Sequence, residues 1–155
     1  MNRTIGDIME RDVYTCRYDQ TLGEVVQIFS EKGTSGITVV DEDDRVVGFI
    51  SDGDIMKAVA AQKTRSIFGG GYSNMVLYDN ESFEEKARAL KRRNVMELAV
   101  QRVLCATADQ TIGEIADVLA KKKFKKLPVV DDEGKLVGVI RRSAITKYIF
   151  GILFQ

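Results

Sequence analysis

The sequence contains no histidine, no tryptophan, a single proline and two cysteines among its 155 residues. Without histidine, the chain lacks the side chain that most often serves as a general base or metal ligand at neutral pH. Neither cysteine has a CxxC neighbour, so no zinc site or disulfide framework is indicated. We expect Cys16 and Cys105 to be buried, reduced thiols on apolar strands.

Net charge and long apolar runs are also missing. The chain has 23 basic and 23 acidic residues, so the molecule as a whole has no field that would hold nucleic acid or an anionic membrane. We expect no nucleic-acid partner and no membrane insertion. The apolar segment 145–154 is far shorter than the roughly 20 residues that span a bilayer, and predicts a buried or subunit-interface helix. The N-terminal segment has no signal-peptide pattern, so we expect a cytoplasmic location.

What the sequence does contain is one unit present twice. Residues 19–24, DQTLGE, return at 109–114 as DQTIGE, and VGFI at 47–50 returns as VGVI at 137–140. One offset of about 90 residues aligns the two copies without a gap. Two units are too few for an open solenoid, but they suffice for a closed pseudo-twofold pair that buries the two apolar faces on each other. Such a pair has two related clefts.

Each copy is predicted to be a strand-helix-strand-strand-helix unit. Thr21 and Thr111 are expected N-caps, with Glu24 and Glu114 completing capping boxes, and the first helices end at Gly33 and in the run 121–123. Acidic turns at 41–44 and 131–134 predict hairpins. The predicted strands are 13–16, 37–40, 46–50, 103–106, 127–130 and 136–140, and the closing helices are 54–61 and 144–154.

We divide the chain into a first repeat at 1–62, a connecting segment at 63–94 and a second repeat at 95–155. Gly69, Gly70 and Gly71 predict a flexible linker, although a phosphate-cradling loop is an alternative. Ser82 with Glu85 could cap a helix that runs to about Arg93.

Several motifs together resemble a known family. The sequences GDIM at 6–9, VGFISDGD at 47–54 and LPVVD at 127–131, with the two helix entries, resemble a tandem cystathionine-β-synthase (CBS) domain pair, often called a Bateman module. The resemblance covers almost the whole chain outside the region of 69–71. It implies an α/β (α+β) fold of two pseudo-twofold-related β-α-β-β-α repeats packed as one module. It also implies a homodimeric regulatory protein that binds adenosine-containing ligands between its repeats.

The family signature for ribose and phosphate is a strand glycine followed by Ser/Thr-x-x-Asp, which Gly48, Ser51 and Asp54 match. A carboxylate can accept both vicinal ribose hydroxyls, and a hydroxyl beside the free amides of a helix N-terminus favours phosphate. The alternative is that Ser51 and Asp54 only cap the helix, because the spacing is also that of a cap. The two roles can coexist.

The second copy departs from this signature. It has arginine at 141 in place of the hydroxyl and alanine at 144 in place of the carboxylate. Either its cleft is empty, or Arg141 and Arg142 have converted it toward an anionic ligand or a protein partner.

The resemblance further implies that each cleft is shared between repeats. Ser51 and Asp54 would face a set from the second repeat that forms the rest of the ligand site: Leu104, Cys105, Ala106, Lys125, Lys126, Leu127 and Pro128. A solvated helix end is the alternative for the lysine run 121–126. The opposite cleft would be met by Ser35, Gly36 and Ile37, which carry no positive charge, so we expect one working site per chain.

Three functions are compatible with these residues. The first is a non-catalytic sensor that binds an adenine nucleotide (AMP, ADP or ATP) and signals to an unidentified target protein. The second is a structural dimerisation module that uses the apolar final helix and needs no nucleotide. The third, an enzyme with a metal at Asp52 and Asp54, lacks a third ligand. The choice among the three nucleotides and S-adenosylmethionine stays open.

Overall fold

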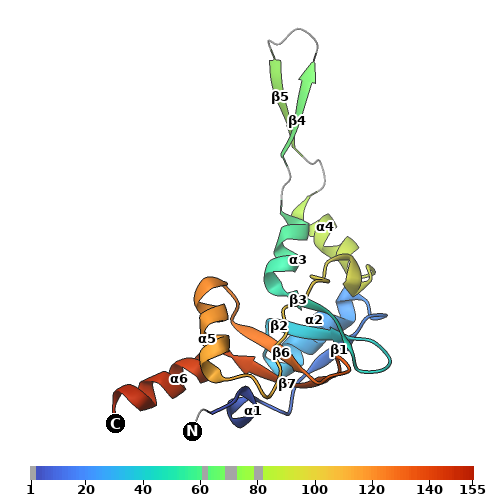
Figure 1. The fold of residues 1–155 in the computed structure, drawn as a ribbon. Coiled ribbons are helices and arrows are strands. Elements are labelled where there is room, and N and C mark those ends of the chain that lie inside the picture. Colours follow the sequence, from blue (N-terminus) through green and yellow to red (C-terminus); the bar gives the residue numbers. More distant parts are fainter. Residues whose placement is uncertain (1–2, 61–62, 69–72, 79–81) are drawn as a thin grey trace.

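The computed structural model describes residues 3–60, 63–68, 73–78 and 82–155. They form a mixed α+β structure in which two similar units pack into one body, and a β-hairpin projects from that body beside α3 and α4 (Figure 1). The predicted fold class is confirmed.

The first unit contains a three-stranded sheet. Strand β1 is parallel to β2, and β2 is antiparallel to β3, with Ile37 opposite Ile50. The first helix begins as predicted, because the Thr21 hydroxyl accepts a hydrogen bond from the Glu24 amide at 3.3 Å, and it ends at Gly33, where φ is 63°. The elements are β1 (Thr15–Arg17), α2 (Leu22–Lys32), β2 (Gly36–Val40), β3 (Val46–Ser51) and α3 (Asp52–Val59).

The second unit repeats this order with a shorter sheet. The predicted strand at 103–106 is wrong, since a single bridge joins Ala106 to Val129. Pro128 stands where the first unit has Thr38, and proline has no N–H with which to extend the ladder. The elements are α5 (Ile112–Lys121), β6 (Lys126–Val130), β7 (Leu136–Arg141) and α6 (Arg142–Leu153).

Both closing helices start two residues before their predicted positions, at Asp52 and Arg142. The far end of α6 is exposed in this chain, with Leu153 69% and Phe154 87% accessible. No helix among the described residues has the length and apolar character needed to cross a membrane.

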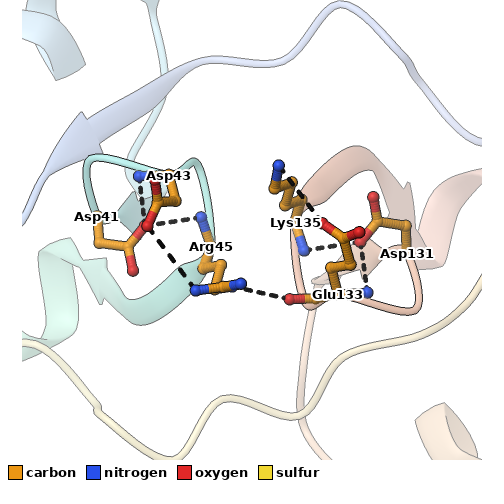
Figure 2. Close-up of polar contacts among 6 residues, drawn as sticks. All are labelled: Asp41, Asp43, Arg45, Asp131, Glu133 and Lys135. Atoms are coloured by element: carbon orange, nitrogen blue, oxygen red, sulfur yellow. Dashed lines mark hydrogen bonds and ion pairs between the residues drawn. The ribbon is translucent and has the colours of Figure 1, made fainter.

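The two predicted acidic turns lie face to face (Figure 2). In each turn one aspartate closes the loop: Asp41 accepts from the Arg45 amide at 3.0 Å and Asp131 from the Lys135 amide at 3.0 Å. The Arg45 guanidinium donates to the Glu133 carbonyl of the other turn at 3.0 Å. The related contacts, 90 residues apart in the sequence, place the pseudo-twofold axis between the two turns.

The two units also exchange their N-terminal segments. Helix α1 (Ile5–Ile8) leads to Glu10, which pairs with Val139 of the second unit, and the short helix η1 (Val95–Glu97) leads to Val100, which pairs with Phe49 of the first. Ile5 is fully buried in the core of the second unit, and Val95 is fully buried in the core of the first. Each core therefore needs a segment from the other repeat.

The connecting segment contains a hairpin that the sequence analysis did not predict. Strands β4 (Lys63–Phe68) and β5 (Ser73–Tyr78) pair in antiparallel orientation, and the prediction of a flexible linker stays a prediction. Gly69, Gly70 and Gly71 lie outside the described residues. Helix α4 (Phe83–Leu90) has the predicted cap, since the Ser82 hydroxyl accepts from the Glu85 amide at 3.2 Å, and it ends before Arg93.

Candidate functional site

A cavity of about 580 Å³ opens between the two repeats. The first repeat contributes residues 33–36 and the junction of β3 with α3, and the second contributes Val100 and residues 102–104 and 123–128. A cavity of this size is in the range that holds a small ligand. The exchange of N-terminal segments builds one wall, because the pairing of Val100 with Phe49 fixes the start of 100–104 beside β3.

Ser51 and Asp54 line this cavity at the start of α3. They form a capping box. One Asp54 oxygen, Oδ2, accepts from the Ser51 amide at 3.0 Å and from the Ser51 hydroxyl at 3.1 Å. The capping role is therefore present, and the same carboxyl group lines the cavity. A role in ligand binding stays a prediction.

Seven of the nine residues predicted to bind ligand line this cavity. They are Ser51, Asp54, Leu104, Lys125, Lys126, Leu127 and Pro128. The other two, Cys105 and Ala106, are not among its lining residues. Ala106 is fully buried, and its backbone is occupied, since its amide donates to Pro128 and its carbonyl accepts from Val130.

Lys126 holds the two repeats together at the cavity wall. Its ammonium group donates to the Gly36 carbonyl, and to the Thr34 hydroxyl at 3.3 Å. Burial and the nearby positive charge of Arg141 lower the pKa of the Lys126 ammonium, while Glu10 opposes them. A phosphate that bound Lys126 would have to compete with these contacts. Lys125 is exposed.

The two cysteines are both free. Cys16 is buried on β1, as predicted, and burial raises the pKa of its thiol to about 12. Cys105 is half-buried and lies outside any strand, and burial raises its pKa as well. Within the described ranges, no group of three or more His, Cys, Asp or Glu residues is placed to hold a metal ion.

The second cleft is a pocket of only about 30 Å³. Arg141 stands in it where the first cleft has Ser51, and Glu10 stands where the first cleft has Val100. The two form an ion pair at 2.9 Å, and both line the pocket. Of the residues predicted to meet this cleft, Gly36 and Ile37 line it, but Ser35 lines the large cavity instead.

Arg142 is not among the residues that line either cleft. Its guanidinium group donates to the carbonyls of Leu119 and Lys122, both at 2.8 Å, and of Phe124 at 3.0 Å. It thus satisfies carbonyl groups at the end of α5. The sequence left open whether Arg142 converts its cleft toward an anionic ligand or a protein partner; in the structure its guanidinium group makes hydrogen bonds inside the second repeat.

Sequence reasoning missed several residues that line the large cavity. Lys57 lies three positions after Asp54 on α3, and this helical spacing could have identified it. Arg102 and Val103 come from an irregular segment, in which no periodic pattern predicts where a side chain points. Arg141 lines both the large cavity and the small pocket.

A β-α-β-β-α unit and a second unit of the same order without the first strand exchange segments around one cavity. Together they define a tandem-repeat module. The chain belongs to the CBS domain family, because the family model of the CBS domain matches residues 5–61 and 95–151. The resemblance noted in the sequence is confirmed.

Three known proteins illustrate the relationship. The protein MJ1426 of Methanocaldococcus jannaschii is 31% identical over 147 residues, which are 90% of this chain and 86% of that protein. The crystal structure of CBSX2 in complex with AMP is similar with a TM-score of 0.71 and 23% identity, over 97% of this chain and 98% of that chain. CBSX2 comes from Arabidopsis thaliana. The CBS domain pair of MJ0100, in complex with 5'-methylthioadenosine and S-adenosyl-L-methionine, has a TM-score of 0.70 and 20% identity, over 98% and 99% of the two chains.

Proposed function

We propose that this chain is a non-catalytic regulatory module that binds an adenosine-containing ligand, of the AMP, ADP or ATP class, in the large cavity. The ligand would contact both repeats and so favour one arrangement of them. A separate target protein, or a second copy in a homodimer, would respond to that arrangement. We place this activity in the cytoplasm.

The observation that supports this proposal is the convergence of Ser51 and Asp54 with Lys125 and Lys126 on one cavity. A carboxylate suited to ribose hydroxyls and cations suited to phosphate come from different repeats and face the same space. CBS pairs of the same fold have been crystallised with AMP and with S-adenosyl-L-methionine, which makes adenosine compounds the first ligands to test.

Thermal unfolding with AMP, ADP, ATP and S-adenosylmethionine tests the proposal. A ligand at 100 times its dissociation constant should stabilise the folded protein by about 2.7 kcal/mol. We expect a rise in melting temperature with at least one compound, and loss of that rise in Asp54→Ala.

Because Asp54 also caps α3, its removal lowers stability without ligand by about 1 kcal/mol. The matched control is Asp7→Ala, which removes the carboxylate of an equivalent capping box at α1. This variant should lose stability but keep the ligand-induced rise. Equal rises in Asp54→Ala and Asp7→Ala would refute the assigned role of Asp54.

A second candidate, a dimerisation module without nucleotide, is favoured by one observation. Five apolar residues near the end of α6 are exposed: Ile149, Phe150, Ile152, Leu153 and Phe154. If no adenosine compound changes the melting temperature, and the chain is dimeric by sedimentation, this second function replaces the first.

A further inference from the structure

The wall of the large cavity is strongly basic although the chain has no net charge. Two carboxylates, Asp52 and Asp54, line it. Six cationic side chains line it as well: Lys57, Arg102, Lys123, Lys125, Lys126 and Arg141. The cavity wall therefore has a local excess of positive charge, and a local excess of one sign attracts ligands of the other.

Two of these six cations already have partners. Lys126 donates to Gly36 and Thr34, and Arg141 is paired with Glu10. The side chains of the other four make no hydrogen bond or ion pair within the part of the chain that the structure describes, and all four are exposed. Like charges that line one cavity without counterions repel one another, so an anion bound among them relieves that repulsion.

These four cations come from three separate segments. Lys57 is on α3, one turn beyond Asp54, Arg102 precedes α5, and Lys123 and Lys125 lie between α5 and β6. Cations supplied by three segments give the cavity more positive charges than a single phosphate can contact, because a phosphate contacts only its immediate neighbours. The remaining wall includes apolar side chains, among them Phe49, Val100 and Leu104, which suit a purine ring.

We propose that the cavity selects adenine nucleotides with two or three phosphates, ADP and ATP, and discriminates against S-adenosylmethionine. The inference rests on the proposed function and extends it to the choice of ligand. The methionine part of S-adenosylmethionine has a net positive charge, because its sulfonium and ammonium groups outnumber its one carboxylate. The positive wall of the cavity should repel it. AMP has one phosphate and leaves most of the four exposed cations without a counterion.

Arg141 supplies a further test because it lines both clefts. Its ion pair with Glu10, at 2.9 Å, reduces the positive charge that it offers to the large cavity. Glu10 does not line that cavity. Glu10→Gln should therefore lower the dissociation constant of ATP by about threefold. It should change adenosine binding little, since adenosine has no charge for Arg141 to attract.

The experiment is isothermal titration calorimetry of the full chain with ATP, ADP, AMP, adenosine and S-adenosylmethionine, in EDTA so that no divalent cation masks the phosphates. We expect ATP to bind about tenfold tighter than AMP, and S-adenosylmethionine to bind more weakly than AMP. Raising the salt from about 0.1 to 1 M shortens the Debye length from about 10 to 3 Å. The higher salt should weaken the binding of ATP much more than the binding of adenosine.

Charge-removing variants locate the effect. Lys57→Gln and Arg102→Gln should each weaken ATP binding by about three- to tenfold and leave adenosine binding unchanged. The matched controls are Lys147→Gln and Arg92→Gln, which remove exposed cations outside the cavity and should change neither ligand. Circular dichroism of each variant checks that it is folded.

The results separate this inference from the function on which it rests. Equal binding of AMP and ATP, or tighter binding of S-adenosylmethionine, would overturn the phosphate-number inference and leave the adenosine-binding function standing. Failure of all five compounds to bind would overturn both. Inorganic tripolyphosphate that binds as tightly as ATP, with no binding of adenosine, would also overturn both, since the cavity would then recognise polyanions without the nucleoside.

Discussion

At one pair of equivalent positions, the two repeats use different residues for the same backbone conformation. In the acidic turns, Asp44 has a φ of 62° and its equivalent Gly134 has a φ of 79°. Both lie in the left-handed region, which costs a residue with a Cβ about 1 to 2 kcal/mol. Aspartate is among the few side chains that tolerate this conformation, so the first repeat can do without the glycine that the second repeat uses.

The same substitution should therefore have opposite effects at two glycines of the second repeat. Gly134→Ala should destabilise the protein by about 1 kcal/mol because of its positive φ. Gly113→Ala should stabilise it by about 0.5 kcal/mol, since Gly113 is helical and an added Cβ would meet nothing closer than Thr111 Oγ1 at 3.9 Å. Urea denaturation measures both, and a loss of stability in Gly113→Ala equal to that in Gly134→Ala would contradict the argument.

At the scale of elements, Arg142 connects the start of α6 to the end of α5 through three carbonyl groups. Arg142→Gln should lower the free energy of unfolding by about 1.5 kcal/mol, because hydrogen bonds from a charged donor are lost and carbonyls remain unpaired. Lys147→Gln, an exposed change on the same helix, should stay within about 0.5 kcal/mol of the parent protein. Similar values for the two variants in chemical denaturation would show that the end of α5 does not depend on Arg142.

The elements that were predicted from sequence are those fixed by local contacts. Helices α2 and α5 begin where Thr21 and Thr111 accept amide hydrogen bonds, and a cap acts within four residues. The contact between Glu10 and Arg141 spans 131 residues. No local pattern encodes it, so this ion pair in the second cleft was not predictable from the sequence. The hairpin of β4 and β5 was missed because a glycine run favours a linker.

The site was predictable to the extent that it follows the repeated signature. Ser51, Asp54 and the first three residues of β6, 126–128, line the cavity because they belong to elements whose order the repeat fixes. The repeat shows that two units are equivalent, but not which segments surround the space between them. Lys123 and Arg102 line the cavity because of how the two units pack, whereas Cys105 does not line it.

At the scale of the whole molecule, the exchange of N-terminal segments depends on close backbone approach. A Cβ on Gly138 would lie 2.7 Å from the Glu10 carbonyl oxygen and 2.9 Å from the Met9 sulfur. At the equivalent Gly48, the shortest distance, to the Val100 carbonyl oxygen, is 3.3 Å. Glycine thus allows each segment to pair with the strand of the other repeat.

Gly138→Ala should consequently destabilise the protein by about 1 to 3 kcal/mol through overpacking, and Gly48→Ala by less. Because each core contains a residue of the exchanged segments, both variants should still unfold in one transition. Circular dichroism and tyrosine fluorescence, followed together through the same melt, should coincide. Two separated transitions would mean that the repeats unfold independently, against the exchanged architecture.

The exchange also determines when a growing chain can fold. The first repeat is incomplete when it leaves the ribosome, because Val95 of its core has not yet emerged. Its own Ile5 must meanwhile stay available for a core whose members begin at Ala106. Domains usually fold in order from the N-terminus during synthesis, but here neither half has a finished interior before most of the chain has emerged. A nascent chain that stalls before residue 95 would expose the unfilled apolar core of the first repeat, and chaperones bind such surfaces.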